Sequence, residues 1–337
     1  MPSSATSEGR RLPTFADVLD AARRLEGHAV LTPLLHSETL DRMVGGRLLV
    51  KAEPLQRTGS FKFRGAFNRI SRLSPDERDG GVVAYSSGNH AQGVAAAASL
   101  LGVKATIVMP TDAPKVKAQG TLSWGAEVVT YDREKGSREE IAARLAADRG
   151  VTTVAPFDDP FIIAGQGTAG LELADQAAGF GARLDAVLVS CGGGGLIAGC
   201  ALALKQRAPT ADVYAVEPQG FDNTVRSLEA GTRVEARPGA RSFCDALLVP
   251  RPGELTFAIN RRLLAGGLVV SDDEAAFAMA AAFRHLKLVL EPGGAVALAA
   301  ALTDKFDCRD RTVAVVASGG NVDPDTFADA LRRVPGA

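Results

Sequence analysis

The hydrophobic pattern along the chain alternates between short apolar runs and longer amphipathic stretches. The runs are rich in Val, Ile, Leu and Ala, as is typical of strands covered on both faces; they read RLLV, VVAY, ATIVM, EVVTY, AVLVS, VYAV and TVAVVA. The stretches between them, among them HAQGVAAAASLLG, REEIAARLAADRG and TAGLELADQAAG, have a helical period and end at glycine. An earlier helix should begin at Thr14, with Asp17 as its capping partner. The alternation predicts an α/β fold with parallel sheets flanked by helices.

Three unusual loops follow predicted strands. SSGNH follows VVAY, CGGGG follows AVLVS, and SGGN follows TVAVVA. Open parallel sheets bind their ligands at the carboxyl ends of the strands. We therefore expect the three loops to form one shared site.

Composition narrows the class of protein. The 337 residues are 46% hydrophobic and 23% charged, a balance that supports a large core and, at this length, about two domains. The formal charge is −1 and no stretch clusters Lys and Arg. We therefore expect a small-molecule partner and neither nucleic acid nor membrane.

The cysteines and the N-terminal stretch indicate the compartment. The four cysteines show no CxxC pair and no His at metal-ligand spacing, which argues against a zinc site or a disulfide framework. The polar start lacks the apolar core of a signal peptide, and no window is long and apolar enough for a membrane span. We expect a cytoplasmic protein with reduced cysteines.

The glycine run from Gly192 to Gly195 has the composition of a phosphate-binding loop. It follows a predicted strand and opens a predicted helix, so unhindered backbone N–H groups and a positive helix end converge there. A tight turn alone would need fewer glycines. The stretch also fits the dinucleotide pattern G-x-G-x-x-A from Gly193 to Ala198, with Glu217 where a ribose-binding acid would stand. A nicotinamide enzyme is therefore a rival interpretation.

Lys62 stands where an idle lysine is unexpected. It follows the polar loop of KAEPLQRTGSFKFRGA, starts a helix, and is flanked by Phe61 and Phe63. Apolar neighbours, a helix N-terminus and nearby cations all destabilise an ammonium, which favours the neutral amine that condenses with an aldehyde. By itself the position is also compatible with a surface lysine.

Five motifs then stand in the order and approximate spacing of a known family: QRTGSFKFRGA, SSGNHAQG, SCGGGGLIAG, EPGGA and ASGGNVD. On these motifs the chain resembles the threonine dehydratase and serine racemase branch of fold-type II pyridoxal-phosphate enzymes, over about residues 15 to 330. The nicotinamide interpretation leaves SFK, SSGNH and SGGNVD unexplained, and it is kept only as a distant alternative.

The resemblance implies the two-domain fold type II architecture, similar to the tryptophan synthase β-subunit. Residues 1–81 and 158–337 would form the large cofactor-binding domain, and residues 82–157 a small mobile domain that closes over the substrate. The resemblance also implies a homodimer.

The resemblance implies how the cofactor, pyridoxal 5′-phosphate, is held. Lys62 would carry it as a Schiff base, Phe61 would pack on its ring, and Asn89 would bond the ring hydroxyl. Ser318 would face the ring nitrogen, where a hydroxyl supports a neutral ring and early loss of a β-leaving group. Glu291 would lie near the ring in an open role. Backbone amides of the loop would hold the phosphate, from Gly192, Gly193, Gly194, Gly195 and Leu196.

The SSGNH loop resembles the family's site for the substrate carboxylate. Its residues are Ser86, Ser87, Gly88, Asn89 and His90. In the racemase members a serine at the place of Ser87 is a second acid and base on the opposite ring face, although a serine there can also simply start a helix. His90 is interpreted as a residue that holds the loop or lies beside the carboxylate.

Arg138 and Ser242 are further candidates for contact with the substrate. Arg138 resembles a position that reaches a second substrate carboxylate, which raises 3-hydroxyaspartate as a substrate; a surface ion pair with a neighbouring Glu is the alternative. Ser242 is a candidate for the pocket wall.

Glu217 matches a ligand for a divalent cation in the racemase-like members. Their further carboxylate appears here as Asn223, beside Asp222, so this chain departs from the pattern. One carboxylate and carbonyl oxygens would bind Mg²⁺ only weakly, and the cation is an open expectation.

The function that this sequence predicts is a threonine/serine ammonia-lyase. The freed amine of Lys62 would remove the Cα proton, the β-hydroxyl would leave with a proton, and a 2-oxo acid and ammonia would form. The alternatives in the same family are a serine racemase that uses Lys62 and Ser87, and a 3-hydroxyaspartate dehydratase. The preferred β-hydroxy amino acid is left open.

Overall fold

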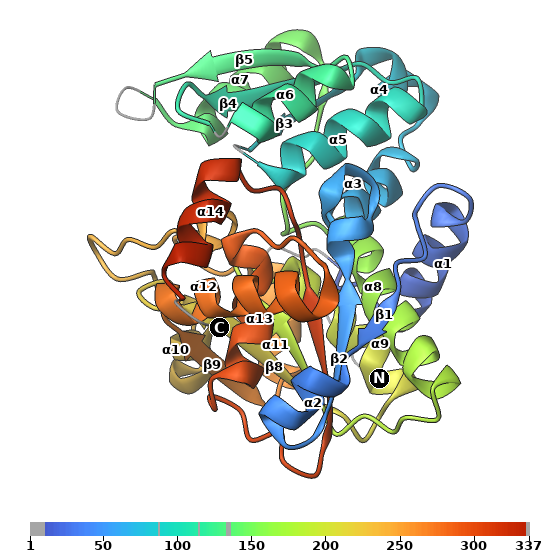
Figure 1. Ribbon diagram of the computed structural model, residues 1–337. Helices are drawn as coiled ribbons and strands as arrows, with labels where there is room; N and C mark the ends of the chain where they lie inside the picture. The colour runs from blue at the N-terminus through green and yellow to red at the C-terminus, as the bar shows by residue number, and fades with distance from the viewer. Residues whose placement is uncertain (1–10, 87, 114, 133–135, 335–337) are drawn as a thin grey trace.

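The computed structural model describes residues 11–86, 88–113, 115–132 and 136–334. Its elements form two bodies, a smaller one that contains the strands from β3 (Val82–Tyr85) to β6 (Thr152–Thr153), above a larger one that contains the other strands (Figure 1). Each body is built around its own sheet.

The strands coincide with the predicted apolar runs and add three more. They are β1 Leu34–His36, β2 Arg47–Ala52, β3 Val82–Tyr85, β4 Ala105–Pro110, β5 Glu127–Tyr131, β6 Thr152–Thr153, β7 Ala186–Ser190, β8 Asp212–Pro218, β9 Gly266–Val270 and β10 Thr312–Ala317. The strands that the apolar runs did not predict are β1, β6 and β9. β1 and β6 have three and two residues, and β9 begins with two glycines, so none carries a strong pattern.

The two sheets are almost entirely parallel. The larger has the strand order β1-β2-β10-β7-β8-β9 and the smaller the order β5-β4-β3-β6. At the centre of the larger sheet Val315 lies opposite Val50 on one side and Leu188 on the other. Edge strand β1 is antiparallel to β2, with Leu34 opposite Lys51. The predicted fold class is confirmed, and one antiparallel edge strand is added to it.

Fourteen α-helices connect and cover the strands in the part of the chain that the structure describes. They are α1 Phe15–Leu25, α2 Glu38–Val44, α3 Lys62–Ile70, α4 Pro75–Gly80, α5 Asn89–Leu100, α6 Lys115–Ser123, α7 Arg138–Arg149, α8 Pro160–Gly179, α9 Gly195–Arg207, α10 Asn223–Ala230, α11 Glu254–Leu263, α12 Asp272–Ala281, α13 Pro292–Leu302 and α14 Pro324–Arg332. The backbone N–H of Thr14 donates to Asp17 Oδ2 at 2.7 Å, which confirms the predicted start of α1.

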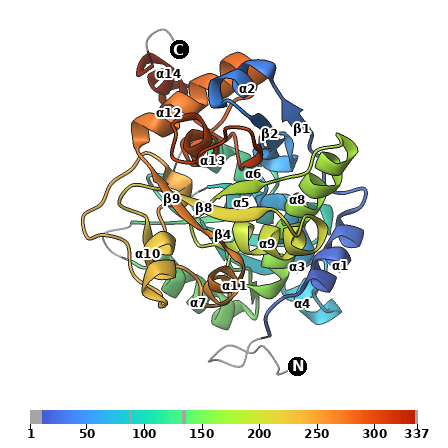
Figure 2. The same ribbon diagram turned by 90° about the horizontal axis from the view of Figure 1, so that it is seen from below.

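The larger sheet is covered on both faces (Figure 2). Successive residues of a strand point to opposite sides, so Val50 packs in the core with α12 and α13, while Leu49 packs in the core with α8 and α9. Alanine is frequent at the buried positions of α12 and α13, and it allows α13 to approach the sheet closely and α12 to pack closely on α13. A sheet covered on both faces leaves the carboxyl ends of its strands as the open edge for a ligand.

The smaller sheet has a core of its own that crosses the predicted boundary. Val94 of α5 and Ile107 of β4 pack in one cluster with Phe63 and Phe67 of α3. The predicted limits 82 and 157 enclose all four strands of this sheet, while α3 joins the two bodies. As domain limits they stay a prediction.

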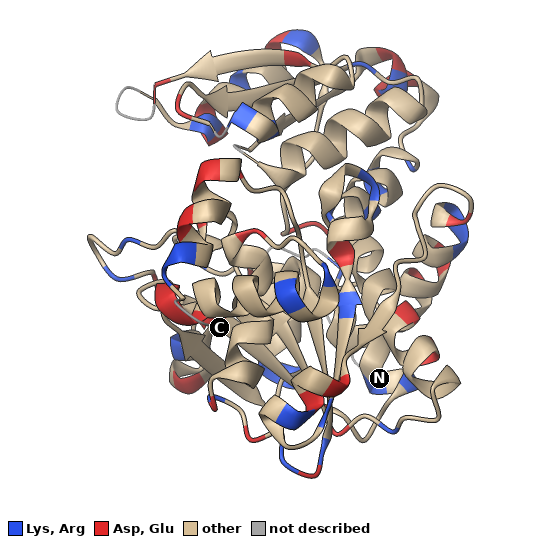
Figure 3. Cartoon of the chain, in the orientation of Figure 1, with Lys and Arg blue, Asp and Glu red and all other residues tan. Residues whose placement is uncertain are grey.

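Charged residues are spread over the surface. Blue segments of Lys and Arg and red segments of Asp and Glu are scattered over both bodies in Figure 3. This distribution agrees with the formal charge of −1. None of the helices in the described ranges combines the length and the apolar character that crossing a membrane requires.

Candidate active site

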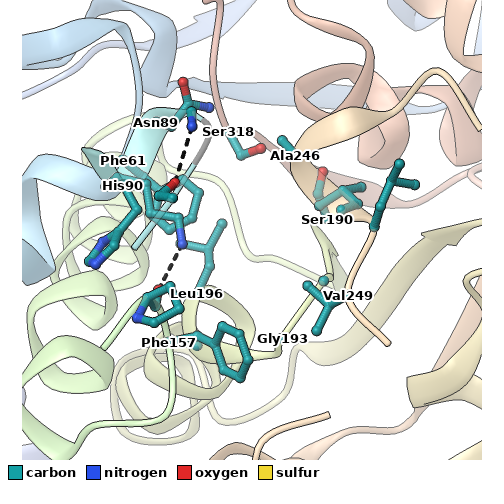
Figure 4. Close-up of a pocket in the computed structure, with 18 of the residues that line it drawn as sticks. Phe61, Asn89, His90, Phe157, Ser190, Gly193, Leu196, Ala246, Val249 and Ser318 are labelled. Carbon is teal, nitrogen blue, oxygen red and sulfur yellow. Dashed lines mark hydrogen bonds between the residues drawn. The ribbon is translucent and has the colours of Figure 1, made fainter. Parts of the chain in front are cut away.

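One pocket lies where the two bodies meet, and the three special loops line it together. Ser86 and Gly88 come from the end of β3, Gly192 to Gly195 from the end of β7, and Ser318 from the end of β10. In Figure 4, Asn89 and Phe61 lie on one side of the pocket and Ser190 and Val249 on the other. The loops converge as the strand pattern predicted, because all three strands present the same end to the pocket.

Lys62 is the first residue of α3, and its amine lies inside the pocket. The Nζ donates to the carbonyl of Pro156 at 2.8 Å and lies 5.3 Å from the centroid of the Phe61 ring. Burial lowers the pKa of Lys62 to about 8, although the negative charge of Glu291 opposes the shift. A substantial fraction of the amine is therefore neutral near this pH, as an amine that reacts with an aldehyde or removes a proton must be.

The glycine loop forms the turn between β7 and α9. Gly194 has φ of 89°, which a side chain rarely adopts, and a Cβ on Gly193 would lie 2.3 Å from the ring of Phe157. The loop therefore requires glycine at these positions. Its backbone N–H groups lie at the N-terminus of α9, where a helix favours an anion.

Two buried hydrogen-bond donors that line this pocket have no acceptor among the described residues. They are Ser190 Oγ and Gln166 Nε2, and the amide oxygen of Gln166 is already bonded to the N–H of Gly65 at 3.1 Å. Unpaired buried donors are costly, so they indicate a ligand that accepts hydrogen bonds. A phosphate group beside the glycine loop and an aldehyde beside Lys62 fit these features, and pyridoxal phosphate carries both.

Asn89 and Glu291 form a bonded pair at the opposite wall. Asn89 starts α5, and its Nδ2 donates to Glu291 Oε1, while its Oδ1 accepts from Asn321 Nδ2 at 2.8 Å. Glu291 precedes α13, and its side chain is buried. Burial raises the pKa of Glu291, and the Lys117 ammonium and the Asn89 amide oppose the shift. The structure thus places both predicted residues at the pocket, and their roles toward the cofactor stay predictions.

Ser318 and His90 complete the buried wall. Ser318 follows β10 directly, is 5% exposed, and accepts the N–H of Phe61 on its carbonyl at 3.2 Å. His90 Nε2 lies 3.0 Å from the carbonyl of Val154. Burial and the Lys62 charge lower the pKa of His90 to about 3, so the ring is neutral at ordinary pH. The interpretation of His90 as a residue that holds the loop agrees with this bond.

Arg138 lines the outer part of the pocket. It is the first residue of α7, its Nε donates to Glu139 Oε1 at 2.8 Å, and its guanidinium lies 5.8 Å from the centroid of the Tyr85 ring. The arginine is thus paired with a neighbouring Glu and also lines the pocket, and its contact with a substrate carboxylate stays a prediction.

Four predicted site residues lie elsewhere or cannot be placed. Ser242 is not among the pocket residues, because its Oγ donates to Asp272 Oδ1 at 2.5 Å; the expectation that it lines this pocket is not met. Asn223 Nδ2 donates to the carbonyl of Val249 at 2.7 Å. Ser87 lies outside the described residues.

Glu217 is the fourth, and it caps a helix in this structure. Its two carboxylate oxygens accept the N–H groups of Thr224 at 2.9 Å and Val225 at 2.8 Å. Among the described residues, no cluster of three or more His, Cys, Asp or Glu could hold a metal ion. The cation therefore gains no support from the geometry and stays a prediction. The same capping role explains the acidic residue that suggested a dinucleotide site.

Lys117 is a pocket residue that sequence reasoning missed. It lies on α6 and is almost fully buried, and its Nζ is 2.7 Å from Asp245 Oδ2 and 3.0 Å from Glu291 Oε2. Burial lowers the pKa of Lys117, but the two carboxylates outweigh it and hold the pKa above its ordinary value. The signal was available, since Lys117 follows the strand ATIVMP at the start of a helix, much as Lys62 follows its own strand and loop.

Comparison with known proteins agrees with this geometry. The model of the family described as pyridoxal-phosphate dependent enzyme matches residues 25–319. The chain is 44% identical to L-threo-3-hydroxyaspartate ammonia-lyase of Pseudomonas sp, over 96% of this chain and 99% of the relative. It is 38% identical to serine racemase of Schizosaccharomyces pombe, over 97% and 100%.

A solved structure extends the likeness to three dimensions. The threonine deaminase of T.th. superposes with a TM-score of 0.86 at 46% identity, over 92% of this chain and 99% of that one. The matched region contains the lysine, the glycine loop and the serine after β10. The chain belongs to the family of pyridoxal-phosphate-dependent enzymes, with the fold of type II.

Proposed function

We propose that the protein is an ammonia-lyase that eliminates water from a small β-hydroxy amino acid and releases a 2-oxo acid and ammonia. The observation that carries the proposal is the amine of Lys62, which lies in the pocket with its pKa lowered to about 8. An amine that is partly neutral near neutral pH can both bind an aldehyde cofactor and remove a proton.

The residues around Lys62 would hold the cofactor. The amides of the glycine loop, Ser190 and Gln166 supply donors for its phosphate, and Asn89 and Ser318 lie along the remaining wall. When bound, pyridoxal phosphate stabilises negative charge that develops on the substrate Cα. The hydroxyl of Ser318 is uncharged and supports a neutral ring, which favours prompt loss of a β-leaving group.

Lys62 would act as the general base at Cα. In its neutral form, a free Lys62 amine would accept the Cα proton of a bound substrate. It then carries an ammonium proton in the same pocket, where a leaving hydroxyl needs one. One side chain can thus serve both proton transfers.

Among β-hydroxy amino acids, 3-hydroxyaspartate is the substrate that we propose first. Arg138 lines the pocket at the start of α7, and a guanidinium pairs well with a second substrate carboxylate. The relative that is 44% identical is named for L-threo-3-hydroxyaspartate. Threonine and serine, which the sequence favoured, are the next candidates.

Serine racemisation is the second candidate function, and relatives of this name support it. It requires a second acid and base on the ring face opposite Lys62, for which the sequence offers Ser87. A racemase and a lyase share the first proton removal, so the partition after that step decides between them.

A substrate panel tests the proposal. L-threo-3-hydroxyaspartate, L-serine, D-serine and L-threonine are each incubated with the holoenzyme, and both 2-oxo acid and enantiomer content are measured. We expect oxo acid from 3-hydroxyaspartate with the highest kcat/KM and little inversion. Dominant inversion would instead identify a racemase. Full elimination activity in Lys62→Ala would refute the mechanism.

An Arg138 variant tests the choice of substrate. Arg138→Gln should raise KM for 3-hydroxyaspartate by about tenfold to a hundredfold, the effect of losing one charge-assisted contact, and leave KM for serine nearly unchanged. Arg144→Gln, on the exposed surface of the same helix, is the matched control. Equal losses for both substrates would remove the argument for a dicarboxylate.

A homodimer and a weakly bound divalent cation are further proposals from the resemblance. Light scattering of the holoenzyme tests the first, and a metal analysis after dialysis with Mg²⁺ tests the second. A monomeric mass would exclude the homodimer, and a metal content near zero would exclude the bound cation.

A further inference from the structure

The two bodies of the molecule are joined at the pocket by a buried ion cluster. Lys117 belongs to α6 beside the smaller sheet, whereas Asp245 and Glu291 belong to the larger body. The Nζ of Lys117 lies 2.7 Å from one carboxylate and 3.0 Å from the other. A single cation thus holds two anions across the line where the bodies meet.

The burial of the three side chains differs in a useful way. The exposed fraction is 3% for Lys117 and 1% for Glu291, but 42% for Asp245. Separation of the bodies would take the cation from Glu291, whose charge is almost fully buried in this structure, whereas Asp245 is already partly solvated and would lose less. The cluster therefore resists opening mainly through the pair between Lys117 and Glu291.

Neighbouring contacts act across the same line. Asn89 at the start of α5 bonds both Glu291 and Asn321, and the N–H of Val116 donates to Asp323 Oδ1 at 3.3 Å. Lys117 also supports the loop for the substrate, because a Cβ on Gly88 would lie 3.1 Å from the Lys117 Cδ. The lysine stem thus lies against one wall of the pocket and its ammonium against the other.

We propose that Lys117 is a positioning residue that latches the smaller body onto the larger one and keeps Glu291 as a carboxylate beside Asn89. The latch holds Ser86, Gly88 and Asn89 at the pocket and gives Asn89 a fixed acceptor. This role of Lys117 is to keep the two bodies together at the pocket, and it does not depend on which reaction follows. The proposal therefore applies to a lyase and to a racemase alike.

A role in proton transfer fits the geometry less well. The two carboxylates hold the pKa of Lys117 above its ordinary value, and an ammonium so strongly paired is a poor acid. Lys62 lies in the same pocket with the opposite shift and is the better proton carrier. A side chain with a permanent positive charge, such as arginine, should therefore replace Lys117 without loss of its role in holding the two bodies together.

The chain offers a direct optical reporter for the latch. It has one tryptophan, Trp124, which follows α6 and packs in the core of the smaller body. The cofactor would bind to the glycine loop of the larger body, so energy transfer from Trp124 to bound cofactor measures how closely the bodies approach. The same variant without cofactor supplies the reference fluorescence.

The experiment compares four variants as holoenzymes. Lys117→Gln removes the cation, and Asp245→Asn removes the charge of the exposed carboxylate. Lys117→Arg keeps the positive charge on a group that does not give up its proton at ordinary pH. Lys115→Gln, exposed on the same helix, is the matched control. Energy transfer from Trp124, kcat and KM are measured for each.

We expect weaker energy transfer in Lys117→Gln and, to a smaller extent, in Asp245→Asn. KM should rise by about tenfold in Lys117→Gln, as it would if the closed fraction fell to about a tenth, while kcat changes less. Lys115→Gln should match the unaltered protein. A fifth variant that combines Lys117→Gln with Asp245→Asn should lose less energy transfer than the sum of the two single losses, because both substitutions act on one cluster.

Two results would overturn the latch. Energy transfer and KM that stay at their original values in both Lys117→Gln and Asp245→Asn would exclude it. Lys117→Arg with full energy transfer but without turnover would show that the ammonium donates a proton. If Lys117→Gln does not fold, Asp245→Asn decides alone, since its side chain is partly exposed. The fluorescence readout needs no substrate, so it separates failure of the latch from failure of the proposed reaction.

Discussion

At the scale of single residues, the two lysines of the pocket have opposite pKa shifts because their surroundings differ. Lys62 has an aromatic ring and a backbone carbonyl near its amine and one distant carboxylate, so burial dominates and lowers its pKa to about 8. Lys117 has two carboxylates in contact, so charge pairing dominates and raises its pKa. The same side chain is therefore suited to proton transfer at one position and to ion pairing at the other.

The first prediction follows from the pKa of Lys62. A general base must be neutral, so kcat should fall by about tenfold for each pH unit below about 8 and level off above it. Glu291→Gln should move this midpoint to lower pH, because the Glu291 charge raises the pKa of Lys62. Steady-state rates over the pH range, with circular dichroism as the control for folding, provide the measurement. A flat profile below the midpoint would contradict the assignment of Lys62 as base.

At the scale of elements, helix starts position most of the site. Lys62 starts α3, Asn89 starts α5, and the glycine loop leads into α9. Helix α11 supports that loop from outside, since Thr256 Oγ1 donates to the carbonyl of Gly193 at 2.7 Å. Asp158 holds the start of α11, because its carboxylate accepts the N–H groups of residues 254 to 256.

The second prediction concerns this cap. Asp158→Ala removes the acceptor from three N–H groups and should destabilise the protein by about 1–2 kcal/mol, or a few degrees in Tm. It should also weaken cofactor binding, because Thr256 would hold Gly193 less firmly. Thermal unfolding and cofactor titration measure the two effects, and Asp148→Ala on the exposed part of α7 is the control. An unchanged cofactor Kd in Asp158→Ala would show that the start of α11 does not influence cofactor binding by the glycine loop.

At the scale of the whole molecule, two bodies with separate cores share one pocket. Helix α3 packs against α5 on one side and α8 on the other, and it carries Lys62 at its start. An ion pair from α6 and a hydrogen bond between side-chain amides from α5 reach the larger body around the same pocket. A ligand in this pocket touches both bodies, so binding should couple to their approach.

The third prediction concerns removal of the cofactor. A ligand that binds only the folded protein stabilises it by about 2.7 kcal/mol at a hundredfold excess over its Kd. The cofactor-free protein should therefore unfold at a temperature several degrees lower, as scanning calorimetry would measure. Adding cofactor to the cofactor-free unaltered protein should restore its Tm in full. Adding cofactor to Lys62→Ala should raise the Tm of that variant by a smaller amount. Equal Tm values with and without cofactor would show that the pocket does not couple binding to stability.

Local patterns in the sequence determined the fold class and the centre of the site. Valine-rich runs between helical stretches predict parallel strands wherever they occur, and a loop at the carboxyl end of such a strand has little freedom in where it lies. Lys62, the glycine loop, Asn89 and Ser318 all stand in such loops or directly after them, so the sequence sufficed to bring them into one pocket.

Only the tertiary structure decided the partners of individual side chains. Glu217 and Ser242 carry groups that could serve a cation or a substrate, but packing gives their oxygens to the start of α10 and to Asp272. The position of Lys117 after a strand indicates that it lies near the site, but it becomes a paired, buried cation only because Asp245 and Glu291 arrive from distant parts of the chain. Backbone periodicity is a local property, whereas desolvation and charge pairing depend on which segments meet, and the sequence does not display that.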